Sequence, residues 1–263
     1  MNSSSTVLRR RRLIHLWDLL RELVVRDMKV RYKRSVLGIA WSLISPLMQL
    51  LVFYFLFRVI LAIKIPRYSS FTLSGLLAWN WFQSSVSQAT SAITGNRELI
   101  RRPGFPTIVL PVVTVTTNLI HFLLALPILL VVLVMDGTTL GPTILALPLV
   151  VILQFVLTLS LAYLAASANV IFADTQHLLV VLLQLLFFLT PIFYDASAVP
   201  ERYRLLYRLN PMVSLLEAYR AVFIGGRQPD WLSLLGPCLL SLGLLYVGCR
   251  ILSRVSYRFV EEL

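Results

Sequence analysis

Residues 103–135 read PGFPTIVLPVVTVTTNLIHFLLALPILLVVLVM and contain no charged side chain. A helix rises about 1.5 Å per residue, so about 20 apolar residues cross a hydrocarbon core that is about 30 Å thick. The run is longer than this requirement, and it lacks the alternation of apolar and polar residues that is typical of a membrane barrel strand. The sequence therefore predicts that this segment spans a membrane as a helix.

Five further segments share this absence of charge and are long enough, or nearly so, to cross a membrane. They are residues 35–57, 68–96, 137–173, 175–194 and 231–249. The chain of 263 residues is 58% apolar and 14% charged, with a mean hydropathy of +0.81, whereas a soluble domain has about 25% charged residues. This composition disfavours a soluble enzyme and a disordered chain. The segments predict an all-α, polytopic membrane protein with six transmembrane helices.

The distribution of positive charge predicts the orientation of the chain. Sixteen of the 24 Lys and Arg residues lie on the side that would hold both termini, and seven lie on the other side. The positive-inside rule places both termini in the cytoplasm, so the net charge of +12 indicates orientation and a membrane-surface collar, not nucleic-acid binding. The predicted parts are a cytoplasmic tail and interface helix at 1–34, a transmembrane domain at 35–252 and a cytoplasmic tail at 253–263.

Residues 13–34 repeat apolar side chains at helical spacing between charged ones, which predicts an amphipathic helix at the cytoplasmic membrane surface. This helix is either a simple electrostatic anchor or a docking collar for a partner. Its candidate contact residues are Trp17, Arg26, Lys29, Arg31 and Lys33.

A polar stripe marks the second predicted span. Asn80, Ser84, Ser87, Gln88 and Ser91 recur at spacings of three and four, which places them on one face of a helix. Unpaired polar groups in hydrocarbon are costly, so this face meets either protein or water. The two interpretations are hydrogen bonding between packed spans and a hydrated conduit for a polar substrate.

Two loops carry further candidates. Arg97, Glu98, Leu99 and Arg101 form a short charged segment that ends at Pro103. This segment is either a loop that only sets topology or a knob that docks into a cytosolic partner.

The external loop at about 195–230 contains a helix start at Asn210-Pro211 and a stop at Gly225-Gly226. Its helix is too short and too charged to span a membrane. The apolar side of this helix is expected to dip into the outer leaflet or to lie along it. The residues of that side are Leu215, Tyr219, Val222 and Phe223.

The chain offers little material for catalysis. Its three His residues are scattered, no cluster has metal-ligand spacing, and no Lys lies in a phosphate-binding loop. The predicted spans contain no carboxylate, which argues against an ion-driven mechanism. The sequence therefore predicts no bound metal or cofactor, and it predicts that any energy source lies in another polypeptide.

Two blocks of sequence resemble a known family. The first is RDMKVRYKRS at 26–35 with LG at 37–38, Trp41 and Pro46, and the second is PIFY at 191–194 with NP at 210–211 and EAYR at 217–220. Together they resemble the ABC-2 type permeases that export bacterial polysaccharides, and the likeness covers essentially the whole chain. The motifs do not separate exporters of O-antigen, teichoic acid and capsule.

The resemblance implies a homodimer in the bacterial inner membrane that binds two copies of a cytosolic ABC ATPase, which would hold ATP and Mg. It implies an interface helix at 13–34, a coupling helix near Arg97 to Arg101 and two short re-entrant helices before the last span. The implied substrate is a lipid-linked glycan, and nucleic acid is no partner. The candidate path residues are Tyr54, Phe57, Trp79, Asn80, Trp81, Ser84, Gln88, Tyr194 and Tyr219.

Two alternatives stay open at this point. An ABC-2 permease with a small amphiphile such as a drug or a lipid as its cargo fits the same motifs. A membrane-embedded enzyme acting on lipid-linked sugars would need Asp, Glu or His side chains in a tight group at the membrane surface. The available pairs for such a group are Asp174 with His177 and Glu98 with Arg101.

Overall fold

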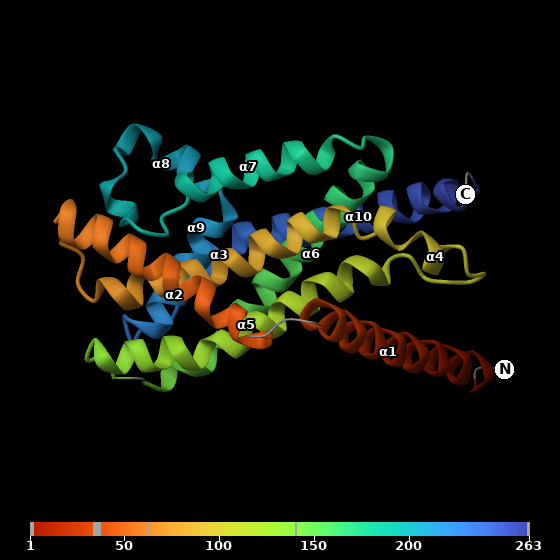
Figure 1. Cartoon of the computed structure of the whole chain (residues 1–263), viewed down its shortest axis with the longest axis horizontal. Coiled ribbons are helices and arrows are strands. Elements are labelled where there is room, and N and C mark those ends of the chain that lie inside the picture. Colours follow the sequence, from red (N-terminus) through yellow and green to blue (C-terminus); the bar gives the residue numbers. More distant parts are fainter. Residues whose placement is uncertain (1–2, 34–37, 63, 140, 262–263) are drawn as a thin grey trace.

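A computed structural model describes residues 3–33, 38–62, 64–139 and 141–261, and every regular element in these ranges is helical (Figure 1). The longer helices are α1 (Ser3–Tyr32), α2 (Trp41–Phe53), α3 (Tyr68–Thr90), α5 (Val109–Met135), α6 (Leu147–Ile171), α7 (Thr175–Leu189), α9 (Pro211–Phe223) and α10 (Trp231–Glu261). The short ones are η1 (Gly38–Ala40), η2 (Tyr54–Ile60), η3 (Thr94–Asn96), α4 (Arg97–Ile100), η4 (Pro142–Ala146), η5 (Ala196–Ala198) and α8 (Glu201–Arg208). The all-α prediction is confirmed.

Among the described residues, four helices are long and apolar enough to cross a membrane. They are Trp41–Ile60, Val109–Met135, Pro142–Ile171 and Trp231–Val255. The other two predicted spans correspond to α3, whose polar stripe lowers its hydropathy, and to α7, which has 15 residues. Helix α7 is shorter than its charge-free segment because Thr190 precedes Pro191 and is extended, with a ψ of 138°.

The bundle is organised around α3. Leu76, Ala78 and Trp79 on this helix are fully buried, and they belong to a core that also includes residues from α5, α6 and α9. Helix α10 packs along α6 with a close approach at Gly248, where an added Cβ would lie 3.0 Å from Tyr163 Cβ and 3.2 Å from the Ser160 carbonyl oxygen. A larger residue at this position would therefore separate the two helices.

The first turn of α1 and the last turn of α10 lie at the same end of the molecule, together with α4, while α8 lies at the other end (Figure 1). Helix α1 begins at Ser3, ten residues before the expected start, because the helical backbone continues through the basic run at 9–12. It is anchored on α5, where Leu23 and Val24 pack against Val109 and Val113. Trp17 is 68% exposed.

The helix α9 begins and ends where the sequence predicts. The Asn210 side chain accepts a hydrogen bond from the Met212 backbone N–H at 3.0 Å, and Pro211 occupies the first turn. Gly226 follows the helix with a φ of +56°, a left-handed conformation that suits glycine. The expectation that the apolar side of α9 meets lipid is wrong, because that side is buried against the protein core. All four of its residues are buried, namely Leu215, Tyr219, Val222 and Phe223.

Candidate functional site

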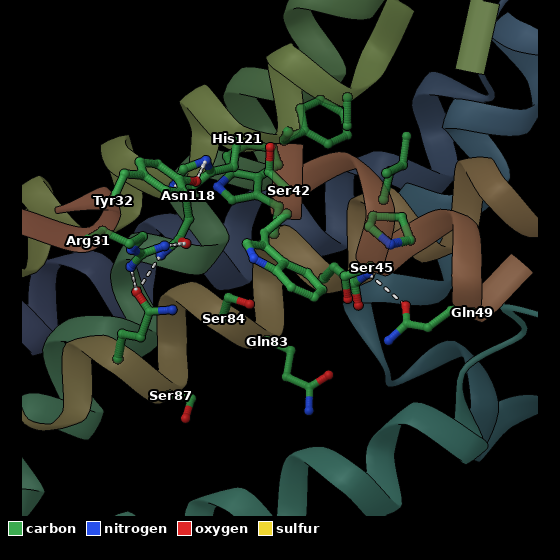
Figure 2. Close-up of a pocket in the computed structure, with 18 residues that line it drawn as sticks. Arg31, Tyr32, Ser42, Ser45, Gln49, Gln83, Ser84, Ser87, Asn118 and His121 are labelled. Carbon is green, nitrogen blue, oxygen red and sulfur yellow. Dashed lines mark hydrogen bonds between the residues drawn. The ribbon is translucent and has the colours of Figure 1, made fainter. Parts of the chain in front are cut away.

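The polar stripe of α3 faces a cavity of about 630 Å³ that is walled by α2, α3, α5 and the end of α1. Figure 2 shows Arg31, Tyr32, Asn118 and His121 at one end of this cavity, with Gln49 and Ser45 toward the other end. We call it the polar cavity. Its polar lining residues are Arg31, Tyr32, Ser42, Ser45, Gln49, Asn80, Gln83, Ser84, Ser87, Gln88, Asn118 and His121.

Part of the stripe pairs across helices, and part of it faces the polar cavity. The Asn80 amide donates to Gln49 Oε1 at 2.9 Å, which joins α3 to α2. Ser84 and Ser87 lie further along the same face of α3, and their short side chains line the cavity (Figure 2). The two interpretations of the stripe therefore both hold in part, because hydrogen bonds between helices frame a space that polar side chains line.

Arg31, the last Arg of α1, closes one end of the polar cavity. Its guanidinium donates to Asn118 Oδ1 at 3.2 Å and to Gln88 Oε1. The Asn118 amide in turn donates to Gln88 Oε1 at 3.1 Å and to the Thr114 carbonyl at 3.0 Å. One cation thus ties the end of α1 to both α3 and α5 through neutral amide oxygens (Figure 2).

Tyr32 makes a second link between α1 and α5. Its hydroxyl lies 3.1 Å from His121 Nδ1, and the two rings meet edge to face with centroids 5.6 Å apart. Burial raises the pKa of Tyr32, while the neighbouring Arg31 charge opposes that shift. The phenol therefore stays protonated near neutral pH, and it keeps a hydroxyl available for the imidazole.

The structure brings Arg31 and four of the predicted path residues into one place. Asn80, Trp81, Ser84 and Gln88 all line the polar cavity. The Trp81 ring stacks on Phe122 with centroids 5.1 Å apart, and its indole N–H points to the Val115 carbonyl at 3.4 Å. Trp81 is only 2% exposed, so these contacts hold its ring in the core at the edge of the cavity.

The other predicted path residues lie elsewhere. Trp79 is fully buried and donates from its indole to Gln83 Oε1 at 2.7 Å, and Tyr219 is 1% exposed in the core. Phe57 stacks on Phe193 with ring centroids 4.7 Å apart. In this single chain these rings serve as packing, and their place on a substrate path stays a prediction.

Tyr54 and Tyr194 are also outside the polar cavity. Tyr54 is 42% exposed on η2, a seven-residue π-helix, and its ring centroid is 6.3 Å from that of Tyr68. Tyr194 donates to the Phe188 carbonyl at 3.1 Å and accepts from the Tyr207 hydroxyl at 2.7 Å, in the segment after α7. The predicted set of rings therefore divides between several parts of the fold.

Sequence reasoning missed the walls that face α3. Ser42, Ser45 and Gln49 are spaced three and four residues apart on α2, and Asn118 and His121 are three apart on α5. Such spacing places each set on one helix face. The same search for polar residues at helical spacing that found the α3 stripe would have found both sets.

The charged segment predicted as a coupling element forms the one-turn helix α4. Ile100 is 3% exposed and Leu99 packs against two apolar clusters, so the turn is held to the bundle by its apolar side. Arg97, Glu98 and Arg101 are exposed. Near this turn Arg26 of α1 donates to Asn96 Oδ1 at 3.4 Å.

At the other end of the bundle, Arg220 of α9 holds the turn that follows α7. Its Nη2 donates to the carbonyls of Pro191 at 2.6 Å and Ile192 at 3.0 Å, and the guanidinium carbon lies 3.4 Å from the Phe71 ring centroid. Gly75 permits this approach, because an added Cβ would lie 3.1 Å from Nη2. The EAYR block thus has a structural role that its sequence did not disclose.

Fold and cavity together define a class, a polytopic helical membrane protein with a polar site between its helices. The ABC-2 type transporter family matches residues 18–224, and the chain belongs to this family. It is 38% identical over 255 residues to an O-antigen export system permease protein RfbA from Myxococcus xanthus, covering 96% of this chain and 98% of that protein. It is 32% identical over 251 residues to an RfbA of Klebsiella pneumoniae, covering 95% and 96%.

A more distant relative carries a different cargo in its name. The polysialic acid transport protein KpsM of Escherichia coli is 25% identical over 243 residues, covering 91% of this chain and 92% of that protein. These likenesses make the chain a transporter subunit and not an enzyme. The described residues contain no group of three or more His, Cys, Asp or Glu side chains placed to hold a metal ion.

Proposed function

We propose that this chain is the transmembrane subunit of an ABC exporter that moves a lipid-linked polysaccharide across the bacterial inner membrane, driven by ATP hydrolysis in a separate subunit. The names of the relatives support polysaccharide as the cargo, and the likeness to them runs over nearly the full length. The missing phosphate-binding loop supports an external source of energy.

The observation that carries the proposal is the chemistry of the polar cavity. Amides and hydroxyls dominate its lining, the exposed Trp41 supplies aromatic surface, and no carboxylate is among its described lining residues. Aromatic faces and neutral hydrogen-bonding groups suit sugar rings, whose hydroxyls both donate and accept. This surface fits a cargo that contains sugars better than a drug or a simple lipid.

We further propose six spans, with α3 and α7 as the two that fall outside the four apolar helices. The polar face of α3 is turned toward α2 and α5, which spares it from lipid. An even number of spans agrees with the position of both chain ends at one end of the bundle, and the excess of Lys and Arg there supports a cytoplasmic location.

A homodimer completes this proposal. Helix α2 and η2 leave a long apolar face uncovered, with Leu51, Phe55 and Val59 each more than half exposed. Two copies of a cytosolic ATPase would then meet α4 and α1 of the two subunits. The exposed charges of α4 and its buried Ile100 support this, because the buried side chain fixes the helix on the bundle while the charged side chains face outward.

The test is expression of the chain with the ABC ATPase of the same organism that is proposed as its partner, in cells that synthesise a polysaccharide but lack their own exporter. We expect polysaccharide at the cell surface only when both proteins are present. The purified chain alone should hydrolyse no ATP, and hydrolysis should appear with the partner. Surface polysaccharide from the ATPase without this chain, or hydrolysis by the chain alone, would overturn the proposal.

A further inference from the structure

The α1 end of the polar cavity combines a cation with neutral sugar-binding chemistry. Among the described residues that line this cavity, Arg31 is the only Arg or Lys, and none is Asp or Glu. Arg31 is solvent-exposed, and the hydrogen bonds given above hold it at the place where α1, α3 and α5 meet (Figure 2). Its positive charge therefore enters a cavity whose walls do not neutralise it.

The hydrogen-bond partners of Arg31 orient its guanidinium and leave some of its donors for a ligand. Gln88 Oε1 and Asn118 Oδ1 are neutral acceptors, and these two hydrogen bonds use two of the five donors of a guanidinium. An arginine whose fork is held in place loses little freedom when it binds a phosphate, and it can bind with two parallel hydrogen bonds. The geometry is that of a preorganised anion site at one end of the cavity.

The rest of the cavity suits a sugar joined to that anion. Asn80 and Gln49 present amides, Ser84 and Ser87 present hydroxyls, and Trp41, which is 53% exposed, supplies an aromatic ring. The volume of about 630 Å³ falls within the range of about 300–1,000 Å³ of small-molecule sites. The site therefore has room for a sugar and a phosphate side by side.

We propose that the polar cavity of a single subunit binds a glycosyl phosphate, with the phosphate on Arg31 and the sugar against Asn80, Ser84 and Trp41. This inference rests on the proposed function and adds to it a place where the linkage between lipid and glycan is recognised. The same chemistry occurs in soluble sugar phosphates, so the experiment separates the two sources. Arg31 is in this view a binding residue and not only a clasp for α1.

The test uses the full-length chain in nanodiscs of neutral phosphatidylcholine, titrated in a calorimeter against four probes. They are octyl glucosyl phosphate, octyl phosphate, octyl glucoside and glucose 1-phosphate. Empty nanodiscs supply the blank for partitioning of the octyl chains. We expect octyl glucosyl phosphate to bind tightest, because it alone offers sugar, phosphate and an apolar tail.

The variants assign each part of the ligand to its residue. Arg31→Gln should weaken both octyl phosphates by about 10- to 100-fold, the range for a lost hydrogen bond to a charged group, and should leave octyl glucoside unchanged. Arg31→Lys should recover part of the lost affinity, and this recovery would show that the Arg31→Gln variant binds weakly because it lacks the charge and not because it is misfolded. Arg21→Gln is the matched control, because Arg21 is an exposed Arg of the same helix that does not line the cavity. Asn80→Leu should abolish the preference for the glucosyl phosphate over octyl phosphate.

Several outcomes would overturn the inference. If the Arg31→Gln variant and the unmodified chain bind octyl phosphate and octyl glucosyl phosphate with equal affinity, Arg31 does not bind the phosphate. If glucose 1-phosphate is the only probe that binds tightly, the site belongs to a soluble ligand. An export assay in parallel keeps the two proposals apart. If the unmodified chain exports polysaccharide but binds none of the probes, the glycosyl phosphate site fails while the exporter function stands.

Discussion

The contact of α6 with α10 at Gly248 gives a stability prediction with a built-in control. A Cβ at this position would lie 3.0 Å from Tyr163 Cβ and 3.2 Å from the Ser160 carbonyl oxygen, and the latter is backbone that cannot rotate away. At Gly243, on the same helix, an added Cβ meets nothing within 4 Å. Replacing each glycine by Ala therefore gives the same gain in helix propensity but opposite outcomes in packing.

The magnitude follows from these two environments. Gly to Ala in a helix interior gains about 1 kcal/mol, while forcing a methyl group into a closely packed contact costs about 1–3 kcal/mol. The propensity gain cancels when the two variants are compared. Gly248→Ala should therefore be less stable than Gly243→Ala by about 1–3 kcal/mol, which for a chain of this size corresponds to about 2–4 °C in Tm for each kcal/mol.

The measurement is the thermal unfolding of both variants and of the unmodified chain, purified in one detergent and heated at one rate. Loss of the monodisperse peak in size-exclusion chromatography reports the midpoint. The expected order is Gly243→Ala at or above the unmodified chain, with Gly248→Ala below both. Identical midpoints for the two variants would show that α6 and α10 are not in close contact at Gly248, and they would refute the packing argument.

Three further predictions concern α9, the turn after α7, and α4. Asn210→Ala should lower the free energy of unfolding by about 1–2 kcal/mol through loss of the helix cap and of the hydrogen bond that the Asn210 amide donates to Thr190 Oγ1. Asn210→Asp removes the amide donor but keeps the cap acceptor, so it should lose less in the same thermal assay. Arg220→Met leaves the Pro191 and Ile192 carbonyls without their donor and should cost about 1–3 kcal/mol; an unchanged midpoint would contradict this role. Glu98→Lys should lower the ATP hydrolysis that the chain stimulates in its partner while the amount of protein in the membrane stays normal, and full hydrolysis would count against α4 as the coupling element.

Residue spacing along the chain predicts more features of this structure than residue type alone. The α3 stripe, the Asn210 cap and the Gly225-Gly226 stop each depend on short-range geometry, and the structure has all three. Which helices face the stripe depends on packing between segments far apart in the sequence, so α2 and α5 were not predicted as its partners. A single sequence contains no direct signal for that choice.

The assignment of aromatic residues to a path shows the limit of reasoning from residue type. Trp79 and Trp81 are two positions apart, which places them about 200° apart around a helix. They therefore cannot share a face. Both are buried in the core, but only Trp81, at 2% exposed, borders the polar cavity. Helical geometry applied to the rings as strictly as to the stripe would have separated them.

The prediction that the apolar side of α9 meets lipid is wrong for a related reason. An amphipathic helix in an external loop fits equally well on lipid and on protein, because both offer an apolar surface of similar character. Arg220 decides between them, since its guanidinium is fixed on the Pro191 and Ile192 carbonyls and so holds α9 against α3 and the turn after α7. The charge that argued against a membrane span is also the group that directs the helix inward.

Helix α1 connects the two parts of the molecule that an ATP-driven mechanism has to join. Arg26 bonds Asn96 beside α4, and Arg31, five residues later, bonds Gln88 and Asn118 at the polar cavity. A helix is stiff over five residues, about 7.5 Å of rise, so a force that shifts α1 along its axis must strain both sets of hydrogen bonds together. In the proposed complex, an ATPase that contacts α4 and α1 would therefore act on the polar cavity through Arg31.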